Sequence, residues 1–268
     1  PTISKWAIRT FWNMPLIGNL IKSRVKSALT NAFGGQLRYF ICGGAAMNPV
    51  VEKCLMDIHF PLSIGYGMTE TGPLIGGNPP KYFKRRSCGV PVANMEVKID
   101  MTNVDNEEAL KNGIGEILVR GANVMLGYYK NEEATKAVFT EDGWMRTGDL
   151  GYMDKKKNIF IKGRSKTMIL GASGQNIYPE EIEDKLNNQE AVGESLVIER
   201  EGKLIALVFP DETLTQKMTF EDIERIMKAN LEKLNNLIPS YSKVSNIEVQ
   251  DKPFEKTPKK SIKRFLYK

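Results

Sequence analysis

The sequence predicts a mixed fold in which an α/β portion precedes a β-rich, barrel-like subdomain and a small α+β domain. Three observations predict this order. Near the amino end, apolar strands run into glycines and then into helices; in the middle, apolar residues repeat every second position; toward the carboxyl end, helices and short strands alternate. We expect the three parts to span residues 1–80, 81–163 and 164–268.

The composition is that of a globular protein. Of the 268 residues, 41% are hydrophobic and 26% are charged. No run of about 18 apolar residues occurs and the amino end lacks a signal-peptide pattern, so we expect a cytoplasmic protein without a membrane-spanning helix. The three cysteines show no metal-ligand or disulfide spacing. The sequence has one histidine, His59, which lies among apolar residues. This argues against histidine-based catalytic triads and against metal sites with several histidines.

The α/β portion is expected to begin with a helix over residues 15–33, whose apolar side chains share one face and which a Gly-Gly pair ends. We expect that face to pack into a core, although basic residues beside it leave a peripheral membrane contact open. A strand over residues 37–42 then meets a Gly-Gly-Ala turn, and Asn48 caps a second helix over residues 49–58. This order lets a backbone approach a ligand closely.

Residues 61–72, PLSIGYGMTETG, place an aromatic ring between two glycines and follow it with two hydroxyls and an acid: Tyr66, Thr69, Glu70 and Thr71. A flat ring can stack on adenine, hydroxyls and free amides can hold a phosphate, and a carboxylate can hold Mg²⁺. For this stretch alone, a buried tyrosine followed by a capped turn is the competing interpretation.

The β-rich subdomain is predicted from a period of two. Residues 95–99 and 115–120 are expected to form strands, and the polar residues 102–112 between them a loop. We also expect an exposed loop at residues 76–88, which are rich in glycine, proline and basic side chains.

Residues 147–183 combine three kinds of chemistry. A Thr-Gly-Asp triplet ends at Asp149, whose oxygens can accept both hydroxyls of a ribose or can serve a turn. A strand over residues 158–162 runs into the sequence GRSK, which contains Arg164 and forms either an anion site or a solvated turn. The sequence GASGQNIYPEE then leads into a helix with Pro179 at its first position.

The carboxyl-terminal pattern predicts an α+β domain with helices over residues 179–188 and 219–236 and strands over residues 193–200, 203–209 and 245–250. Residues 251–268 hold seven Lys or Arg against two acids, so most of the net charge of +6 lies in this tail. No basic run with interleaved aromatics occurs elsewhere to form a groove, so we expect no nucleic-acid partner.

Together, YGMTET, GEILVRGANVMLGYYK, TGDLGYMD, GRSKTMI and GASGQNIYPEEIE resemble the motifs of adenylate-forming enzymes, the family of acyl-CoA synthetases, luciferases and peptide-synthetase adenylation domains. The resemblance implies the end of a large acyl-CoA synthetase-like N-terminal domain followed, after a hinge at Lys166, by the family's C-terminal domain. It also implies cofactor-binding roles for the following residues: Gly44, Ala45, Tyr66, Gly67, Thr69, Asp149, Arg164, Lys166, Gly171 and Gly174.

By this resemblance, Tyr66 stacks on adenine, Thr69 contacts the α-phosphate and Glu70 holds magnesium. Asp149 binds the ribose, and Arg164 contacts the ribose and phosphate side of the nucleotide. The turn at residues 43–47 lines the acyl pocket, and the loop at residues 171–174 covers the pantetheine channel in a second conformation.

The tail sequence TPKKSIKR resembles the family's last motif, in which a Gly-Lys pair follows a threonine and the lysine contacts carboxylate and phosphate during adenylation. Here the pair is Lys260-Ser261, so Ser261 stands in the place of that lysine. Lys260 is the nearest substitute and Lys259 the next. The resemblance thus implies catalytic roles for Lys260, Glu70 and Thr69.

The resemblance implies an AMP-forming long-chain fatty acid-CoA ligase that uses a fatty acid, ATP, Mg²⁺ and CoA, closest in its motifs to bacterial long-chain synthetases. The family's Ser/Thr/Gly-rich phosphate loop does not occur in the sequence, and the chain begins at Pro1, so we expect a fragment that cannot adenylate by itself. Two alternatives stay open: a ligase for another acid or for a carrier-protein acceptor, and a non-catalytic nucleotide-binding module.

Overall fold

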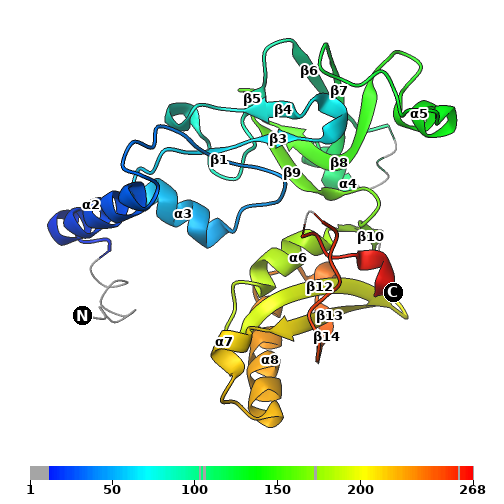
Figure 1. Ribbon diagram of the computed structural model, residues 1–268. Helices are drawn as coiled ribbons and strands as arrows, with labels where there is room; N and C mark the ends of the chain where they lie inside the picture. The colour runs from blue at the N-terminus through cyan, green and yellow to red at the C-terminus, as the bar shows by residue number, and fades with distance from the viewer. Residues whose placement is uncertain (1–11, 103, 105–106, 172–173, 259, 268) are drawn as a thin grey trace. The chain divides into compact units, whose positions relative to one another are not determined.

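The computed structural model describes residues 12–102, 104, 107–171, 174–258 and 260–267. The backbone forms two compact units with a mixed α/β content (Figure 1). The first comprises Pro1–Glu96, Gly121–Tyr129 and Asp154–Phe160, and the second Val97–Arg120, Lys130–Met153 and Ile161–Lys268. The three domain boundaries expected from the sequence stay a prediction.

The first unit opens with helix α2 (Pro15–Ala32), strand β1 (Phe40–Cys42), helix α3 (Pro49–Asp57) and strand β2 (Leu62–Ile64), and the two strands pair in parallel. Helix α3 begins where the sequence predicts because Asn48 Oδ1 accepts the amide hydrogens of Val50 and Val51, and Pro49 fits the first helical position. The predicted order of strand, glycine turn and helix is therefore confirmed.

A small core lies under these elements and is formed by Leu55, Ile58, Phe60 and Leu62. Val25 and Leu29 of α2 pack against it, but Leu16 is 87% exposed, and Ile17 and Leu20 are exposed as well. The prediction that the whole apolar face of α2 packs into a core is wrong for its amino-terminal half, because the described core reaches only Val25 and Leu29. Among the described helices, none combines the length and apolar character needed to span a bilayer.

Three short strands complete the first unit: β3 (Tyr66–Gly67), β4 (Leu74–Gly77) and β5 (Val90–Pro91), which form an antiparallel sheet in that order. The 3-10 helices η1 (Thr69–Thr71) and η2 (Pro80–Tyr82) lie between them in the chain. The loop expected at residues 76–88 is only partly exposed, because Ser87 is buried and the Lys84 ammonium pairs with Asp154 at 2.7 Å.

A four-stranded sheet follows, in the order β6 (Met95–Asp100), β7 (Gly115–Gly121), β8 (Met145–Met153) and β9 (Ile159–Arg164). Helix α5 (Glu132–Val138) begins after Asn131, whose Oδ1 accepts the Ala134 amide hydrogen at 3.0 Å. The expectation of a loop at residues 102–112 is wrong in part, because helix α4 (Glu107–Lys111) forms there and buries Ala109. Good helix formers and one buried methyl group explain this short helix.

The carboxyl-terminal part of the second unit is a sheet with helices packed on it (Figure 1). Its elements are β10 (Ile169–Leu170), β11 (Asn176–Ile177), α6 (Pro179–Leu186), β12 (Val192–Arg200), β13 (Lys203–Pro210), α7 (Glu212–Thr215), α8 (Phe220–Asn235), η3 (Ser240–Ser242), β14 (Val244–Val249) and η4 (Arg264–Leu266). Strand β13 pairs antiparallel with β12 and parallel with β14. The α+β pattern predicted after residue 178 is thus confirmed, including the tight turn at Glu201 and Gly202.

The core of this part combines side chains from α6, α8 and the three long strands: Ile182, Leu186, Val197, Ala206, Val208, Met227, Leu234 and Val244. Thr219 and Asp222 form a reciprocal capping box that fixes the first turn of α8. The apolar face of α8 packs inward through Met227 and Leu234. This core holds α6 and β12 in place, and the tail attaches to both.

We expect Leu234→Ala to lower the free energy of unfolding by roughly 3 kcal/mol, because the side chain is fully buried and its removal leaves a cavity. Urea unfolding of the purified chain measures this change. Leu237→Ala is the matched control, since Leu237 is 60% exposed, and it is expected to change the free energy by less than about 0.5 kcal/mol. Equal losses for both variants would contradict the assignment of Leu234 to the core.

Candidate functional site

The segment of residues 66–74 folds back on itself at a glycine. A Cβ atom at Gly67 would lie 1.8 Å from the carbonyl oxygen of Pro73, a separation that no side chain tolerates. The Met68 amide donates to the same Pro73 oxygen at 2.9 Å. Tyr66, which precedes the fold-back, is buried in the described part of the chain. Gly67 is therefore required by a close approach of two backbone segments.

The two hydroxyls of the predicted phosphate motif differ in their surroundings. Thr71 is fully buried, and its hydroxyl lies 3.0 Å from the Met68 oxygen and 2.9 Å from the Pro73 oxygen. Thr69 is exposed, so its hydroxyl faces outward from the same 3-10 helix. Thr71 thus holds the turn together, while Thr69 remains accessible to a ligand.

Sequence reasoning missed a second segment, residues 121–129, that holds this turn from outside. The Tyr128 hydroxyl donates to Glu70 Oε1 at 2.9 Å, and the Met125 amide donates to the Glu70 carbonyl oxygen at 2.8 Å. The Asn123 side-chain amide donates to the carbonyl oxygens of Thr71 and Leu74. Burial, and then the Glu70 carboxylate, raise the pKa of the Tyr128 phenol, so it donates at neutral pH. Although GANVMLGYYK contributes to the resemblance, no local pattern singles out these side chains.

Glu70 fits the predicted magnesium role as a single protein ligand. Its carboxylate is half-buried and fixed by Tyr128 on one oxygen. Within the described residues, no group of three or more His, Cys, Asp or Glu side chains gathers into a metal site. Magnesium bound together with phosphates needs only one or two protein carboxylates. The arrangement therefore suits an ion that arrives with a nucleotide.

The glycine turn after β1 lies beside the strand that leads to Tyr66. The Gly65 amide donates to the Cys42 oxygen at 2.8 Å, and a Cβ atom at Gly43 would lie 3.1 Å from the Gly65 oxygen. Gly44 has a φ of 85°, which glycine adopts at little cost, and both Gly44 and Ala45 are exposed. The structure therefore brings this turn next to the Tyr66 segment, as the acyl-pocket hypothesis requires.

In the second unit, Asp149 and Arg164 form an ion pair. The Asp149 carboxylate lies on β8 with its side chain only 7% exposed, and the Arg164 Nε lies 3.0 Å from its Oδ1. Arg164 ends the neighbouring strand β9, and its side chain is 65% exposed. The two predicted nucleotide contacts thus adjoin each other, with the carboxylate held in the sheet and the guanidinium reaching into solvent.

Asp149 lies within strand β8, so the interpretation of the Thr-Gly-Asp triplet as a turn is wrong. Polar contacts that the sequence did not reveal fix the strand at Gly148. The Gly148 amide donates to Glu116 Oε1 at 3.2 Å, and Arg146 pairs with the other Glu116 oxygen at 2.6 Å. The Gly148 carbonyl oxygen accepts the Ser165 amide at 2.9 Å. Glu116 on β7 and Ser165 beyond β9 therefore both hold β8 next to Asp149.

The predicted hinge residue, Lys166, lies in a tight turn and is exposed. The amides of Thr167 and Met168 both donate to the Arg164 carbonyl oxygen, at 3.1 and 3.0 Å. The predicted glycine loop then connects β10 and β11: the Gly174 amide donates to the Gly171 oxygen at 2.9 Å, and Gly174 has a φ of 79°. Residues 172–173 at its tip lie outside the described residues.

The tail forms a tight hairpin closed by a bridge between residues 256 and 262. The Lys260 amide donates to the Thr257 oxygen at 2.8 Å, and Lys260 is exposed with a φ of 61°. A positive φ is favoured by glycine and uncommon for lysine. Lys260 therefore adopts the backbone conformation of a glycine, and Ser261 follows it. Lys259 lies outside the described residues.

A buried carboxylate fixes this tail to α6. Glu183 is buried, its Oε1 accepts the Val197 amide at 2.7 Å, and its Oε2 contacts the Arg264 guanidinium. Burial raises the pKa of Glu183 to about 7, even though Arg264 and the Val197 amide favour the charged form.

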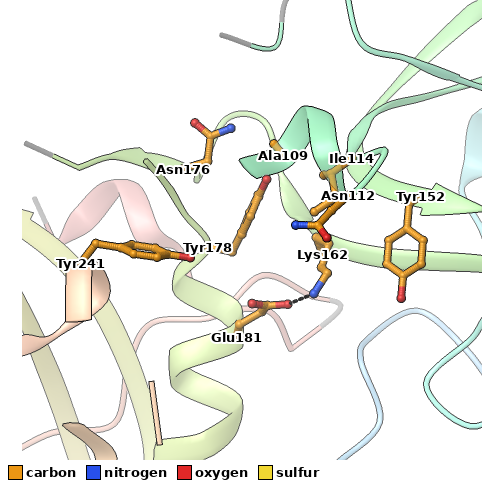
Figure 2. A pocket seen from close by; sticks show the side chains of 9 residues that line it. All are labelled: Ala109, Asn112, Ile114, Tyr152, Lys162, Asn176, Tyr178, Glu181 and Tyr241. Atoms are coloured by element: carbon orange, nitrogen blue, oxygen red, sulfur yellow. Dashed lines mark hydrogen bonds and ion pairs between the residues drawn. The ribbon is translucent and has the colours of Figure 1, made fainter. Parts of the chain in front are cut away.

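The second unit also contains a polar cavity of about 350 Å³ that no sequence pattern indicated. Figure 2 shows Tyr178 and Tyr241 on one side of it, Tyr152 on the other, and the Lys162–Glu181 ion pair, 2.8 Å long, between them. These side chains come from β8, β9, α6, η3 and the link between β11 and α6, so only the tertiary structure brings them together.

The predicted residues therefore fall into two sets. Gly44, Ala45, Tyr66, Gly67, Thr69 and Glu70 belong to the first unit, whereas Asp149, Arg164, Lys166, Gly171, Gly174 and Lys260 belong to the second. Within each set, the structure connects neighbours through backbone and ion-pair contacts. Their roles toward a nucleotide stay predictions.

Two family models match the chain. One, described as AMP-binding enzyme, matches residues 2–129, and the other, described as AMP-binding enzyme C-terminal domain, matches residues 166–267. Long-chain-fatty-acid–CoA ligase 1 of Saccharomyces cerevisiae is 31% identical over 207 residues, which are 75% of this chain and 28% of that protein. 4-coumarate-CoA ligase 2 of Narcissus pseudonarcissus is 31% identical over 243 residues, which are 84% of this chain and 41% of that protein. The chain thus spans less than half the length of these relatives.

Solved structures agree with the fold. ATP-bound MatB from Rhodopseudomonas palustris matches with a TM-score of 0.71 at 24% identity, over 92% of this chain and 48% of that one. O-succinylbenzoate Coenzyme A synthetase from Bacillus subtilis, in complex with ATP and magnesium ion, matches with a TM-score of 0.67 at 26% identity, over 89% of this chain and 49% of that one. The predicted mixed α/β fold, an AMP-binding region followed by a C-terminal domain, is confirmed.

We expect Gly67→Ala to destabilise the first unit by about 3 kcal/mol, because the new Cβ atom would overlap the Pro73 oxygen. The matched control is Gly77→Ala on the adjoining strand, where nothing lies within 4 Å of a Cβ atom, and we expect it to be neutral within about 1 kcal/mol. Amide hydrogen exchange of residues 66–77 measures both. Equal protection in the two variants would contradict the close approach at Gly67.

The raised pKa of Glu183 predicts a pH-dependent stability. Its ordinary value is 4.5, so between about pH 4.5 and 7 the folded chain binds a proton that the unfolded chain has lost. The free energy of unfolding is therefore expected to fall, relative to that of Glu183→Gln, by roughly 3 kcal/mol as the pH rises through this window. Urea unfolding at pH 5 and pH 8 measures the difference, with Glu232→Gln as the exposed control. A constant difference would show that Glu183 stays ionised throughout.

Proposed function

Because the chain belongs to the AMP-binding enzyme superfamily, and within it to the adenylate-forming acyl-CoA ligases, we propose that the reaction it serves joins a long-chain fatty acid to coenzyme A. In the first step, a carboxylate oxygen attacks the α-phosphorus of ATP and pyrophosphate leaves. In the second, the CoA sulfur attacks the acyl carbonyl, the thiol proton is lost and AMP leaves.

The observation that carries this proposal is the ion pair of Asp149 and Arg164, 3.0 Å long, at the edge of the β8–β9 strand pair. The Asp149 carboxylate has acceptor oxygens for two ribose hydroxyls, and the Arg164 guanidinium has donors left over for a phosphate. The pair places carboxylate acceptors directly beside exposed guanidinium donors. A nucleotide monophosphate needs this combination.

Glu70 and Thr69 are proposed to serve the phosphates. Glu70, fixed by Tyr128, would hold the magnesium ion that accompanies ATP and offsets the negative charge of its phosphates. The exposed Thr69 hydroxyl would donate to the α-phosphate, while the buried Thr71 keeps the turn in place. Tyr66 is proposed to contact adenine, although its burial in the described residues leaves little of its ring accessible.

The choice of a long-chain fatty acid is supported by two stretches that resemble bacterial long-chain synthetases more than peptide-synthetase adenylation domains: TGDLGYMDKKKNIFIKGRSKTMI and TPKKSIKRFLY. The relatives named above include ligases for long-chain fatty acids and for coumarate, so an aromatic acid is the competing substrate.

The tail supports a second candidate, a nucleotide-binding module that does not adenylate. Lys260 occupies a glycine-like backbone conformation, and Ser261 follows it at the position where the family places its lysine. Catalysis would then require Lys260 to reach the substrate from one residue earlier. A shift of this size matters because electrostatic stabilisation depends on close placement at the developing charge.

The first experiment measures AMP binding to the purified chain by calorimetry. We expect Asp149→Ala to weaken AMP binding at least tenfold, because ribose hydroxyls lose their acceptors and Arg164 loses its partner. Asp251→Ala, which removes an exposed acid, is the control and is expected to bind as the unmodified chain does. Equal affinity of the two variants would contradict a ribose contact at Asp149.

The second experiment measures thioester formation with ATP and CoA by the longest polypeptide that the gene encodes. Saturated fatty acids of increasing length are compared with coumarate. Acyl-CoA and AMP from long-chain acids, lost in Glu70→Gln, would support the proposal. Preference for coumarate would favour an aromatic-acid ligase. AMP binding without turnover of any acid would favour the nucleotide-binding module.

A further inference from the structure

A network of three carboxylate contacts joins the turn that holds Lys166 to the tail. On the turn side, the Thr167 hydroxyl donates to Glu180 Oε1 at 2.7 Å. Glu180 lies in the first turn of α6, so the segment directly after Lys166 is tied to the start of that helix. A hydrogen bond from the Thr167 amide to the Arg164 carbonyl oxygen fixes the other end of the turn.

On the tail side, Arg264 contacts the same carboxylate. Its Nη2 lies 3.6 Å from Glu180 Oε1, the oxygen that also accepts the Thr167 hydroxyl, and contacts Glu183 Oε2 more closely. Its Nη1 points to the Val197 carbonyl oxygen at 3.5 Å. Arg264 stands two residues beyond Ile262, which closes the hairpin that carries Lys260 and Ser261. One guanidinium therefore links the hairpin to helix α6 and strand β12.

The network is anchored at one buried carboxylate, while Thr167, Glu180 and Arg264 are partly exposed. Glu183 is buried, and its other oxygen accepts the Val197 amide at 2.7 Å. A buried carboxylate that loses its cation is costly, so the Arg264 side chain has little freedom to move away. Phe254 anchors the tail in an apolar core, but an apolar contact is not directional. Two directional contacts therefore orient the hairpin: the Arg264 guanidinium, which contacts α6, and an ion pair from Lys256 to Glu194 of β12.

We propose that Arg264 is a positioning residue that couples the Lys166 turn to the tail hairpin through Glu180 and Glu183. Thr167, Glu180 and Arg264 all follow Lys166 in the chain, so the network makes the segment after Lys166 and the hairpin move as one body. This inference rests on the proposed function and on the hinge that the family resemblance implies at Lys166, about which the tail would rotate. A rotation at Lys166 would then move Lys260 and Ser261 together with the segment that follows Lys166.

Hydrogen exchange tests the coupling without any activity. Thr167→Val removes only a hydroxyl, and we expect it to accelerate exchange of the Lys260 amide at least threefold, although these residues lie far apart in the chain. Arg264→Gln is expected to accelerate exchange at both the tail hairpin and the Thr167 amide at least tenfold. Arg200→Gln is the matched control, since it breaks an exposed ion pair with Glu248 in the same unit, and it should change neither.

Kinetics of the longest polypeptide that the gene encodes provide the second readout. Arg264→Gln is expected to lower the rate of pyrophosphate release at least tenfold with the KM for ATP unchanged within twofold, and Arg264→Lys to restore part of the rate. AMP affinity should stay unchanged, because the side chains of Asp149 and Arg164 pair with each other and make no contact with Glu180, Glu183 or Arg264 among the interactions described here. Equal effects on the rate and on AMP affinity would overturn the positioning role.

The two proposals fail separately. If no acid supports pyrophosphate release by the unmodified protein, the proposed ligase function fails, whereas the exchange data still decide the coupling. If Thr167→Val leaves the Lys260 amide unchanged and Arg264→Gln affects the hairpin alone, the coupling is overturned even in an active ligase.

Discussion

The ion pair of Asp149 and Arg164 is the interaction on which the part of the candidate site in the second unit depends. It joins neighbouring strands β8 and β9, and the chain enters the Lys166 turn directly after Arg164. Because the Asp149 side chain is almost fully buried, losing the guanidinium would weaken the compensation of a charge held in the sheet. The same pair therefore places the proposed nucleotide contacts and defines the point from which the carboxyl-terminal segment departs.

Close backbone approach is the second constraint. A Cβ atom at Gly67 would lie 1.8 Å from the Pro73 carbonyl oxygen. Asn123 and Tyr128, from another segment of the chain, hydrogen-bond to the same turn. The turn that carries Thr69 and Glu70 is thus held by residues outside the set predicted from the sequence. Preorganisation of this kind reduces the ordering that binding would otherwise require.

In the tail, ionic contacts hold the backbone in place. Phe254 supplies apolar burial, while two ionic contacts set the direction of the tail: Arg264 contacts Glu180 and Glu183, and Lys256 pairs with Glu194. The glycine-like conformation of Lys260 shows that the hairpin keeps its shape without a glycine at that position. The strain of a positive φ is modest, of the order of 1 kcal/mol, and the hydrogen bonds across the hairpin offset it.

The sequence by itself determined the elements whose signals are local. The apolar period of α8, the cap at Asn48 and the hairpin at Glu201 and Gly202 depend on residues a few positions apart, and each formed where predicted. The adjacency of Asp149 and Arg164 was not predicted from the sequence, since it depends on the pairing of strands β8 and β9.

Only the tertiary structure decided which distant groups meet. Tyr128 contacts Glu70 across 58 positions, and Arg264 contacts Glu183 across 81, and neither partner carries a periodic or turn signal. It also decided that Leu16 is exposed on an apolar helical face, because burial depends on what packs opposite. The period of the apolar residues indicates the secondary structure of a segment, whereas its long-range partners depend on the path of the whole chain.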